Sequence, residues 1–499
     1  MKKDNYKEKL RVLHITSELT PIAKAGGLGD VVGQLPKEMA RQFHIEIRII
    51  MPKYKFLDLE KYPAEKIITD LKIASPTGGW WKISVWKTLI PETIIPVYLI
   101  ENNEVFNADD IYKHKPTKIS SHPFFFLSTV ALEFIKIIDW QPNIIHCHDG
   151  MMGLVPKLLK TVYKDDLFYQ KIASVLTIHN LQFQPWFQFS EAKSVGLKQS
   201  DFKPTSKFLK LKVANVMAEA IANADMINTV SLTYAKEVLT KKYGASLDKL
   251  LRTKKKQFTG ILNGVDYSHF DPRTNPDVPV KYWLDSLDKK TENKLYLQKK
   301  LGLIQSASIP LICVISRLTD QKGVGLIEEV LKNLVNMGAQ FVILGSGGKS
   351  VEKIFVKAEK DYPKEIAAEI GFDADFAQTI YAGADMILMP SQFEPCGLSQ
   401  IIAMRFGTIP IVRKTGGLAD TVRDGYTGFV FKHYDKNAFL WAISRAVDVY
   451  YKQKDYWKKM QIMGMKKDFS WKNSAKKYIW LYKKAIRNKK KYLEGLNDK

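Results

Sequence analysis

Cysteine is scarce in this 499-residue chain, and the three cysteines, Cys147, Cys313 and Cys396, lie far apart with no Cys-x-x-Cys pair. The number and spacing of the cysteines therefore suggest neither a disulfide framework nor a zinc site. Long apolar runs are also missing, since no stretch approaches the roughly 18–20 residues that a membrane-spanning helix needs. The N-terminus starts with charged residues but has no apolar core typical of a signal peptide, so we expect a cytoplasmic protein without a membrane partner.

Acidic side chains are in the minority. Lys and Arg number 76 against 52 Asp and Glu, which gives a formal net charge of +24. Lysines are spread along the whole chain, and the two densest basic runs, RTKKKQ and RNKKKY, have the composition of a loop and a C-terminal tail. We therefore predict no nucleic-acid partner, although a general positive potential favours a small anionic substrate.

Short apolar runs alternate with helical patterns along the chain. Strands are expected at 11–16, 45–52, 143–148, 172–179 and 225–231, then at 310–318, 340–347, 385–391 and 408–414, with helices at 124–138 and 325–337 among them. Nearly continuous apolar strands that alternate with helices predict parallel sheets covered on both faces, the doubly wound α/β class. Because the series restarts at residue 310, we expect two such domains, 1–265 and 301–470, with a polar linker at 266–300.

Two nearly identical stretches lie near the two ends of the chain. AKAGGLGDVV begins at Ala23, and RKTGGLADTV begins at Arg413. In each, a lysine precedes a Gly-Gly pair, and a helical segment follows, whose free N–H groups attract anions. One Gly-Gly pair alone is more often a plain turn, but two copies with Lys, Leu and Asp in register favour a phosphate-binding function.

Charged residues follow two of the expected strands in the second half. SRLTDQKG places Arg317 and Lys322 where they could neutralise a departing diphosphate, the alternative being two solvated cations. PSQFEPCGLSQ places Glu394 beyond another strand, where a carboxylate can accept sugar hydroxyls or simply serve as a charge at a helix start. These residues are candidates for a sugar-phosphate site.

Histidines end two expected strands in the first half. IIHCHDG places His146 and His148 on one face, and TIHN adds His179. A zinc site would need further ligands at convincing spacing, so a hydrogen-bonding histidine at a sugar site is the better interpretation. FDAD at 372–375 has the D-x-D pattern of some metal-dependent sugar transferases, but such triplets arise easily by chance. We predict no metal and no cofactor.

These motifs make the chain resemble the bacterial glycogen synthase and plant starch synthase family, the ADP-glucose:α-1,4-glucan glucosyltransferases. The resemblance runs from ITSELTPIAKAGGLGDVVGQLP through HCHD, TIHN, TVSLTYAKEV, GILNGVD and SRLTDQKG to FEPCGL and TGGLADTV. It implies a GT-B fold, with two Rossmann-like domains that face a central cleft. It also implies a metal-free reaction in which glucose passes from ADP-glucose to the non-reducing 4-hydroxyl of the glucan, with retention of the α configuration.

The resemblance also implies a role for each site residue. Arg317 and Lys322 resemble the family's leaving-group cations, Glu394 its glucose-binding carboxylate, and His148 the strand-end histidine that touches the transferred glucose. The substrate-binding residues implied in the same way are Lys24, Gly26, Gly27, Asp30, Asn215, Phe372, Thr415, Gly416 and Gly417. A C-terminal helix and basic tail at 471–499 is expected to cross back to the N-terminal domain, which would bind the acceptor while the C-terminal domain binds the nucleotide sugar.

The chain departs from the family pattern mainly in its acceptor half. Gly150 stands where the family usually has an aromatic residue, and Ala218 and Ala220 replace a Lys and a Gly. Phe372 replaces a Tyr against the adenine and can still stack.

Two alternative functions are left open. One is a nicotinamide-dependent oxidoreductase, which is disfavoured because no G-x-G-x-x-G follows RVLHIT. The other is a non-catalytic glucan-binding protein. UDP-glucose is the alternative donor, and no oligomeric state is predicted.

Overall fold

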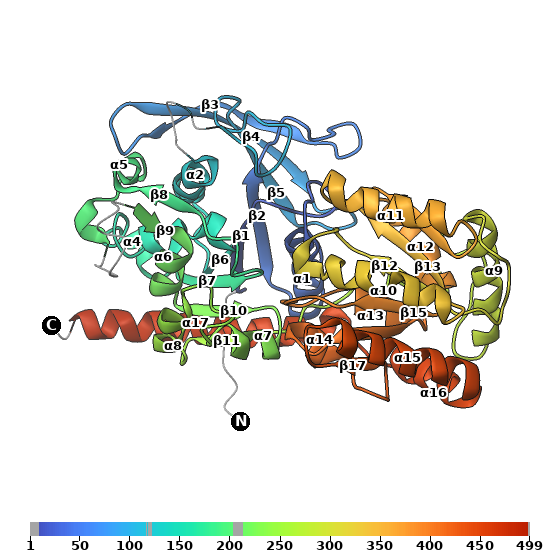
Figure 1. The fold of residues 1–499 in the computed structure, drawn as a ribbon. Coiled ribbons are helices and arrows are strands. Elements are labelled where there is room, and N and C mark those ends of the chain that lie inside the picture. Colours follow the sequence, from blue (N-terminus) through green and yellow to red (C-terminus); the bar gives the residue numbers. More distant parts are fainter. Residues whose placement is uncertain (1–8, 116, 118–121, 203–212, 498–499) are drawn as a thin grey trace. The chain divides into compact units, whose positions relative to one another are not determined.

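A computed structural model of the protein describes residues 9–115, 117, 122–202 and 213–497 (Figure 1). The chain divides into two compact units. The first unit comprises Met1–Val230, Ala235–Gly264 and Trp471–Lys499, and the second comprises Ser231–Tyr234 and Val265–Ser470. No helix among the described residues combines the length and the apolar character needed to span a membrane.

The first unit is built on a nine-stranded sheet. Its strand order is β11-β10-β7-β6-β1-β2-β5-β4-β3. The strands are β1 (Arg11–Ile15), β2 (Glu46–Pro52), β3 (Glu65–Ala74), β4 (Trp80–Leu89), β5 (Pro96–Glu101), β6 (Ile144–His148), β7 (Ala173–Ile178), β10 (Met226–Thr229) and β11 (Phe258–Gly260), while β8 (Trp186–Gln188) and β9 (Val213–Asn215) form a separate ribbon. Pairing is parallel except around β4, which runs antiparallel to both β3 and β5. The sheet reverses its direction of growth between β1 and β6.

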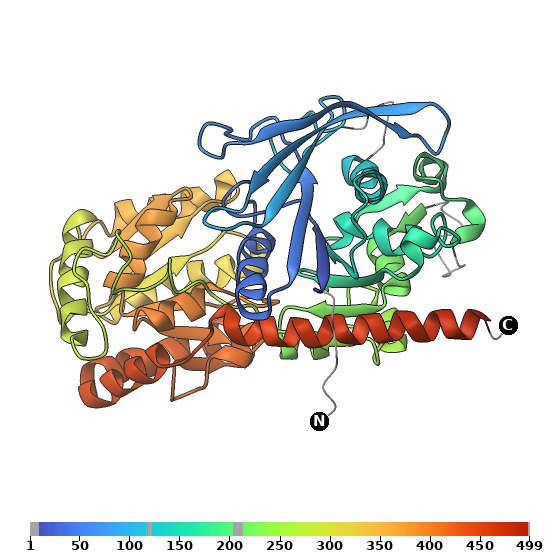
Figure 2. The same ribbon diagram turned by 180° about the vertical axis from the view of Figure 1, so that it is seen from behind.

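Helices of the first unit connect these strands. They are α1 (Gly27–Phe43), α2 (Pro123–Ile137), α3 (Leu154–Leu158), α4 (Leu167–Gln170), α5 (Phe189–Ala192), α6 (Val216–Asn223), α8 (Asp248–Thr253) and α17 (Trp471–Asn497), while α7 (Leu232–Glu237) is divided between the units. The helix α17, red in Figure 2, packs against α1, β6, β7 and β10. The last helix of the chain is therefore part of the first unit.

The second unit is a doubly wound sheet of six parallel strands. Its order is β14-β13-β12-β15-β16-β17. The strands are β12 (Leu311–Ile315), β13 (Gln340–Gly345), β14 (Ile366–Ile370), β15 (Met386–Met389), β16 (Ile409–Arg413) and β17 (Phe429–Phe431). The helices are α9 (Lys290–Lys300), α10 (Val324–Asn336), α11 (Lys349–Asp361), α12 (Ala374–Gly383), α13 (Ser399–Arg405), α14 (Gly416–Thr421), α15 (Lys436–Lys452) and α16 (Lys454–Met465). This sheet reverses its direction of growth between β12 and β15.

Alternation along β12 explains why both faces of this sheet are covered. Leu311 and Cys313 belong to one buried apolar cluster, and Ile312 and Val314 belong to another. Because successive side chains of a strand point to opposite faces, the two clusters lie on the two sides of the sheet. Such a strand reads in the sequence as an unbroken apolar run, which is why its position was predictable.

The segment 266–300 is not the linker that its polar composition predicted. It belongs to the second unit and ends in α9, where Asn293 and Leu297 are fully buried. Asn293 receives the N–H of Val280 and donates to the Val280 carbonyl, at 2.9 and 2.8 Å. Buried polar side chains of this kind satisfy the backbone of an irregular segment, so low hydrophobicity did not indicate a loose connection.

We expect Lys290→Met to destabilise the second unit. The Lys290 Nζ is buried and donates to the carbonyl oxygens of Tyr381 and Ala382, at 3.0 and 2.8 Å, and to the Thr408 hydroxyl at 2.9 Å. Without the amine these acceptors lose a donor, at a cost of about 2–4 kcal/mol in the free energy of unfolding. Denaturant unfolding measures this cost. Lys289→Met, at the exposed neighbouring position, is the control. An equal loss of unfolding free energy in Lys289→Met would contradict the prediction.

The same lysine makes the stability of the second unit depend on pH. Burial lowers the pKa of Lys290 from its ordinary 10.5 to about 7. Between these values the unfolded chain binds a proton that the folded protein does not, so this group makes stability rise as the pH rises from 7 to 10.5. The free energy of unfolding of the wild type, minus that of Lys290→Met, should therefore grow with pH across that window, and a flat difference would contradict it.

Candidate functional site

The candidate residues of the second unit gather at the carboxyl ends of its strands. Arg317 and Lys322 follow β12, Glu394 follows β15, and Thr415 follows β16, and these three strands are neighbours in the sheet. The reversal point between β12 and β15 lies among them. Ligands of doubly wound sheets bind at such a point, outside the carboxyl ends of the strands.

Lys322 and Glu394 form an ion pair at this edge. The Lys322 Nζ lies 2.6 Å from Glu394 Oε2, and the Ser391 hydroxyl donates to the same oxygen at 2.9 Å. Glu394 is buried, whereas Lys322 keeps part of its side chain accessible. Gly323 permits the approach of the two loops, because it has a φ of 76° and a Cβ there would lie 2.3 Å from the Pro390 carbonyl oxygen.

The second Gly-Gly pair is packed directly on the loop that carries Glu394. Gly416 has a φ of 43°, and a Cβ on it would lie 1.8 Å from the Glu394 carbonyl oxygen. A Cβ on Gly417 would lie 2.0 Å from the Cys396 carbonyl oxygen, and the Gly417 N–H donates to the Glu394 carbonyl at 3.0 Å. These glycines therefore set the position of the Glu394 loop, beside the buried Thr415.

Two further candidates of the second unit are exposed. Arg317 follows β12 with an accessible side chain, and Phe372, beyond β14, has 82% of its side chain exposed. The neighbouring Asp373 caps α12, since its carboxylate accepts the Phe376 N–H at 2.7 Å. Helix capping therefore explains the presence of Asp373, one of the two acids in the D-x-D pattern, without a metal. The exposed Phe372 ring is free to stack on a planar ring.

In the first unit, the loop after β1 carries the first Lys-x-Gly-Gly copy. The Lys24 Nζ lies 2.7 Å from Asp30 Oδ1, which also accepts the Thr20 hydroxyl at 3.2 Å. Both charged side chains are partly exposed. The corresponding acid of the second copy, Asp420, instead accepts the backbone N–H and the hydroxyl of Thr233, at 2.8 and 2.6 Å. The two copies share a sequence but use their acids differently.

Glu18 organises this loop, and our sequence analysis missed it. Its Oε2 accepts the N–H groups of Ala25 and Gly26, both at 2.7 Å, and its Oε1 accepts the Tyr112 hydroxyl at 2.5 Å. The side chain is 3% exposed. In the sequence, Glu18 lies three residues after β1 within a quoted motif, whereas its backbone partners lie seven and eight positions further along the chain.

The first Gly-Gly pair has room that the second lacks. In the described structure, a Cβ on Gly27 would meet no heavy atom within 4 Å, and one on Gly26 would lie 3.9 Å from Glu18 Oε1. Packing within the protein therefore does not require glycine at these two positions. Because Glu18 already holds the Gly26 N–H, what glycine provides here is an open approach to the backbone of α1 from Gly27 onward, which suits a bound anion.

The histidines at the ends of β6 and β7 form a buried row. His148 Nε2 lies 3.0 Å from His14 Nδ1, and His148 Nδ1 lies 3.0 Å from His179 Nε2. His148 is fully buried, and His179 is 9% exposed. This differs from the expectation that His148 touches the sugar, because both of its ring nitrogens are bonded to other imidazoles. His179 is the least buried member of the row, since His14 and His148 are fully buried.

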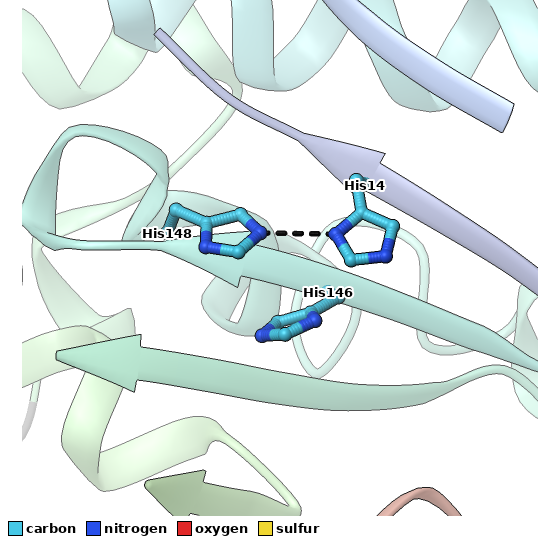
Figure 3. Close-up of side chains that lie close together, drawn as sticks. All are labelled: His14, His146 and His148. Carbon is cyan, nitrogen blue, oxygen red and sulfur yellow. Dashed lines mark hydrogen bonds between the residues drawn. The ribbon is translucent and has the colours of Figure 1, made fainter. Parts of the chain in front are cut away.

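His14, His146 and His148 also bring ring nitrogens within 4.8 Å of one another (Figure 3). The rings of His146 and His148 are stacked, with centroids 4.3 Å apart and planes at 29°. A metal ion binds imidazole in the plane of the ring, so stacked rings do not direct their lone pairs at a common point. The nitrogens of His146 face hydroxyl groups instead, at Tyr482 and Thr177. The arrangement is that of a hydrogen-bonded cluster.

Asp149 joins the ends of the same two strands. It has a positive φ of 56°, and its Oδ1 accepts the backbone N–H groups of His179 and Asn180, at 2.7 and 3.3 Å. Burial raises the pKa of this carboxyl to about 7, and the charge of Glu18 adds to the shift. A carboxyl group with that pKa holds a proton part of the time near neutral pH.

Asn215 serves the structure of α6. Its Oδ1 accepts the Ala218 N–H at 3.0 Å as the helix cap, and its Nδ2 donates to Gln184 Oε1 at 2.5 Å.

Gly150, where the family usually has an aromatic residue, packs closely against neighbouring side chains. A Cβ there would lie 2.6 Å from Pro185 Cδ and 3.4 Å from Met217 Cβ. A larger residue at position 150 would have to displace this packing.

Comparisons with known proteins agree with this geometry. Residues 11–253 match the starch synthase catalytic domain family, and residues 306–461 match the glycosyl transferases group 1 family. The chain is 41% identical over 483 residues to a glycogen synthase of Thermosipho melanesiensis, covering 96% of this chain and 99% of the other. It is 42% identical over 491 residues to one of Thermosipho africanus, covering 96% and 100%.

Solved structures agree as well. The catalytic domain of starch synthase IV from Arabidopsis thaliana, bound to ADP and acarbose, matches with a TM-score of 0.89 and 33% identity, over 96% of this chain and 100% of that chain. Sucrose-phosphate synthase from Thermosynechococcus elongatus covers the same shares with a TM-score of 0.60 and 17% identity, a likeness of fold alone.

Together with these matches, the two α/β domains identify the chain as a glycosyltransferase of the GT-B fold, as its motifs predicted. Within this class of enzymes, the chain belongs to the glycogen synthase and starch synthase family. The family assignment made from the motifs is confirmed.

Proposed function

We propose that this enzyme elongates an α-1,4-glucan by transferring glucose from ADP-glucose to the non-reducing 4-hydroxyl, with retention of the α configuration and release of ADP. The observation that carries the proposal is the Lys322–Glu394 ion pair beside the glycine turn at 415–417. A carboxylate for the sugar and a cation for the diphosphate lie together at one strand edge. We expect the reaction to take place in the cytoplasm.

Cleavage of the glycosyl–phosphate bond leaves positive charge on the anomeric carbon and negative charge on ADP. In the second unit, Arg317 and Lys322 would neutralise the diphosphate, and the backbone of Thr415, Gly416 and Gly417 would hold it. In the free enzyme Glu394 already holds the Lys322 ammonium in place at 2.6 Å. The cation is thus positioned before the donor binds, so little reorganisation is needed when charge develops. Phe372 would stack on the adenine.

The first unit would contribute its own polar groups. Lys24 and the turn at Gly26 and Gly27 would approach the donor phosphates, with the Gly26 N–H held by Glu18 and the backbone from Gly27 onward facing the anion. Asp30 would bind sugar hydroxyls while it positions Lys24. We assign the contact with the transferred glucose to His179 rather than to the buried His148. The role of Asn215 on the acceptor side would be to hold the start of α6, because its side chain is engaged as the cap.

The test is incorporation of label from ADP-[¹⁴C]glucose into glycogen at neutral pH with a metal chelator present. We expect incorporation under these conditions, since we propose that no metal takes part. A parallel reaction with UDP-[¹⁴C]glucose decides between the two donors, and we expect the lower rate there. Glu394→Ala is the matched control. Unlabelled polymer with both donors, or equal labelling by wild type and control, would overturn the proposal.

A further inference from the structure

Two tyrosines of the C-terminal helix α17 reach the polar centre of the first unit. The Tyr482 hydroxyl lies 2.8 Å from His146 Nδ1, and the Tyr478 hydroxyl accepts the Asn228 Nδ2 proton at 3.1 Å. Both tyrosines are fully buried. The two hydroxyl groups therefore complete a hydrogen-bond network that includes His146 on β6, Thr177 on β7 and Asn228 on β10.

The direction of the protons in this network determines the tautomer of His146. The Thr177 hydroxyl donates its single proton to Asn228 Oδ1 at 2.7 Å, so its oxygen must accept the Nε2–H of His146, which lies 2.6 Å away. Burial, with the neighbouring His14 and His179, holds the pKa of His146 well below its usual range, so the ring is neutral. Its Nδ1 is then an acceptor, and the Tyr482 hydroxyl is the donor that it requires. The other contact of that hydroxyl, to Met39 Sδ at 4.0 Å, is too long to compete.

His146 is stacked on the middle member of the histidine row, as Figure 3 shows beside the His14–His148 hydrogen bond. Each neutral imidazole has one N–H, so the two bonds of the row must point the same way along it. Among the described residues, His14 Nε2 has no hydrogen-bond partner, although it is buried. A buried N–H without an acceptor is rare in folded proteins. The protons of the row therefore point from His14 through His148 to His179, which keeps its own proton on Nδ1.

We propose that Tyr482 is a positioning residue for the transfer reaction: through His146 it holds the His148 ring, and with it His179, in the orientation that the reaction uses. This inference rests on the proposed function, since it assigns the sugar contact to His179. Tyr482 acts from the last helix of the chain and touches neither the donor nor the acceptor. Its effect passes through one hydrogen bond and one ring stack to the row, whose least buried end is His179.

The test is Tyr482→Phe, which removes the hydroxyl and keeps the ring that fills the buried space. We expect kcat for transfer to fall about five- to tenfold, as for the loss of one ordinary hydrogen bond, with the KM for ADP-glucose unchanged. ¹⁵N NMR of the free enzyme, labelled at its nine histidines, provides a readout independent of activity. The wild type should show His146 as the Nε2–H tautomer, and the ring nitrogens of His146 and His148 should shift in the variant.

Tyr478→Phe is the matched control. It lies one helical turn away on the same buried face, and its hydroxyl is bonded to Asn228 rather than to His146. The substitution keeps the Tyr478 ring, whose centroid lies 5.7 Å from that of His146. We expect a comparable change in stability, wild-type kcat and unshifted signals of His146 and His148. Equal loss of kcat in the two variants, wild-type kcat in Tyr482→Phe, or unshifted ring nitrogens there would each overturn the proposal. A wild type that transfers no glucose would overturn the proposed function, while the NMR spectra would still decide whether Tyr482 positions the rings.

Discussion

Replacing Lys322 with alanine is expected to lower kcat for glucose transfer by about 10²–10³-fold, the usual loss when one fixed charge contact is removed from a transition state. The ammonium is held 2.6 Å from Glu394 at the strand edge where we place the diphosphate. Its interaction with the departing ADP grows as the glycosyl–phosphate bond breaks, so the loss should fall on kcat rather than on glucan binding. Steady-state rates with varied ADP-glucose and varied glycogen measure the two effects separately.

Lys332→Ala is the control for this substitution. Lys332 lies on the exposed face of α10 and loses the same side chain without contacting Glu394. We expect wild-type kinetics in this variant. A second comparison uses Glu394→Ala together with the double variant. Because the two side chains act as a unit, the double variant should lose less than the product of the single losses. Wild-type kcat in Lys322→Ala would remove Lys322 from the site.

Gly417→Ala is expected to destabilise the second unit by about 3 kcal/mol or more and to abolish most of the activity, because backbone atoms must move to admit the methyl group. The Cβ would lie 2.0 Å from the Cys396 carbonyl oxygen, and the strand-end loop it displaces also carries Glu394. Denaturant unfolding and glucose transfer, measured on the same preparation, should fall together. A variant with wild-type stability would show that the loop can move without cost.

Gly27→Ala is the informative counterpart from the other Lys-x-Gly-Gly copy. No heavy atom of the described structure lies within 4 Å of the new Cβ, and position 27 begins α1, where alanine is favoured over glycine by about 0.5–1 kcal/mol. We expect stability equal to or slightly above that of the wild type. Any loss of transfer rate in this stable variant reports close approach of a ligand to the backbone. A loss of stability as large as that of Gly417→Ala would contradict the distinction between the two copies.

The strands that carry the site were predictable because they are buried on both faces. The runs at 310–318, 340–347 and 385–391 contain β12, β13 and β15, whose continuous apolar sequence needs no tertiary information. The strands β3 and β4 were missed for the opposite reason. β3 is mostly exposed and interrupted by charged residues, and it pairs with β4 through an irregular register. β4 lies inside the sheet and alternates buried and exposed side chains, so neither strand has the continuous apolar run that we used as the signal.

The residues of the candidate site were also predictable only in part. Lys322 and Glu394 stand in recognisable motifs after predicted strands, and the fold brings them together because β12 and β15 are neighbours. Glu18 belonged to a quoted motif, but its role depends on backbone N–H groups that only the loop geometry places against it. His148 was assigned to the sugar by its position at a strand end. Its burial between His14 and His179 could not be read from that position.

The sequence by itself determined the class of fold, the family and the residue types of the site, because hydrophobic periodicity and short motifs are local properties of a chain. Only the tertiary structure decided what each residue contacts. It gave Gly416 and Gly417 a packing role while leaving Gly26 and Gly27 open, and it joined Tyr482 to His146, 336 positions away. Such differences arise because burial and hydrogen bonding depend on which distant segments the folded chain brings together, so two similar short sequences acquire different neighbours.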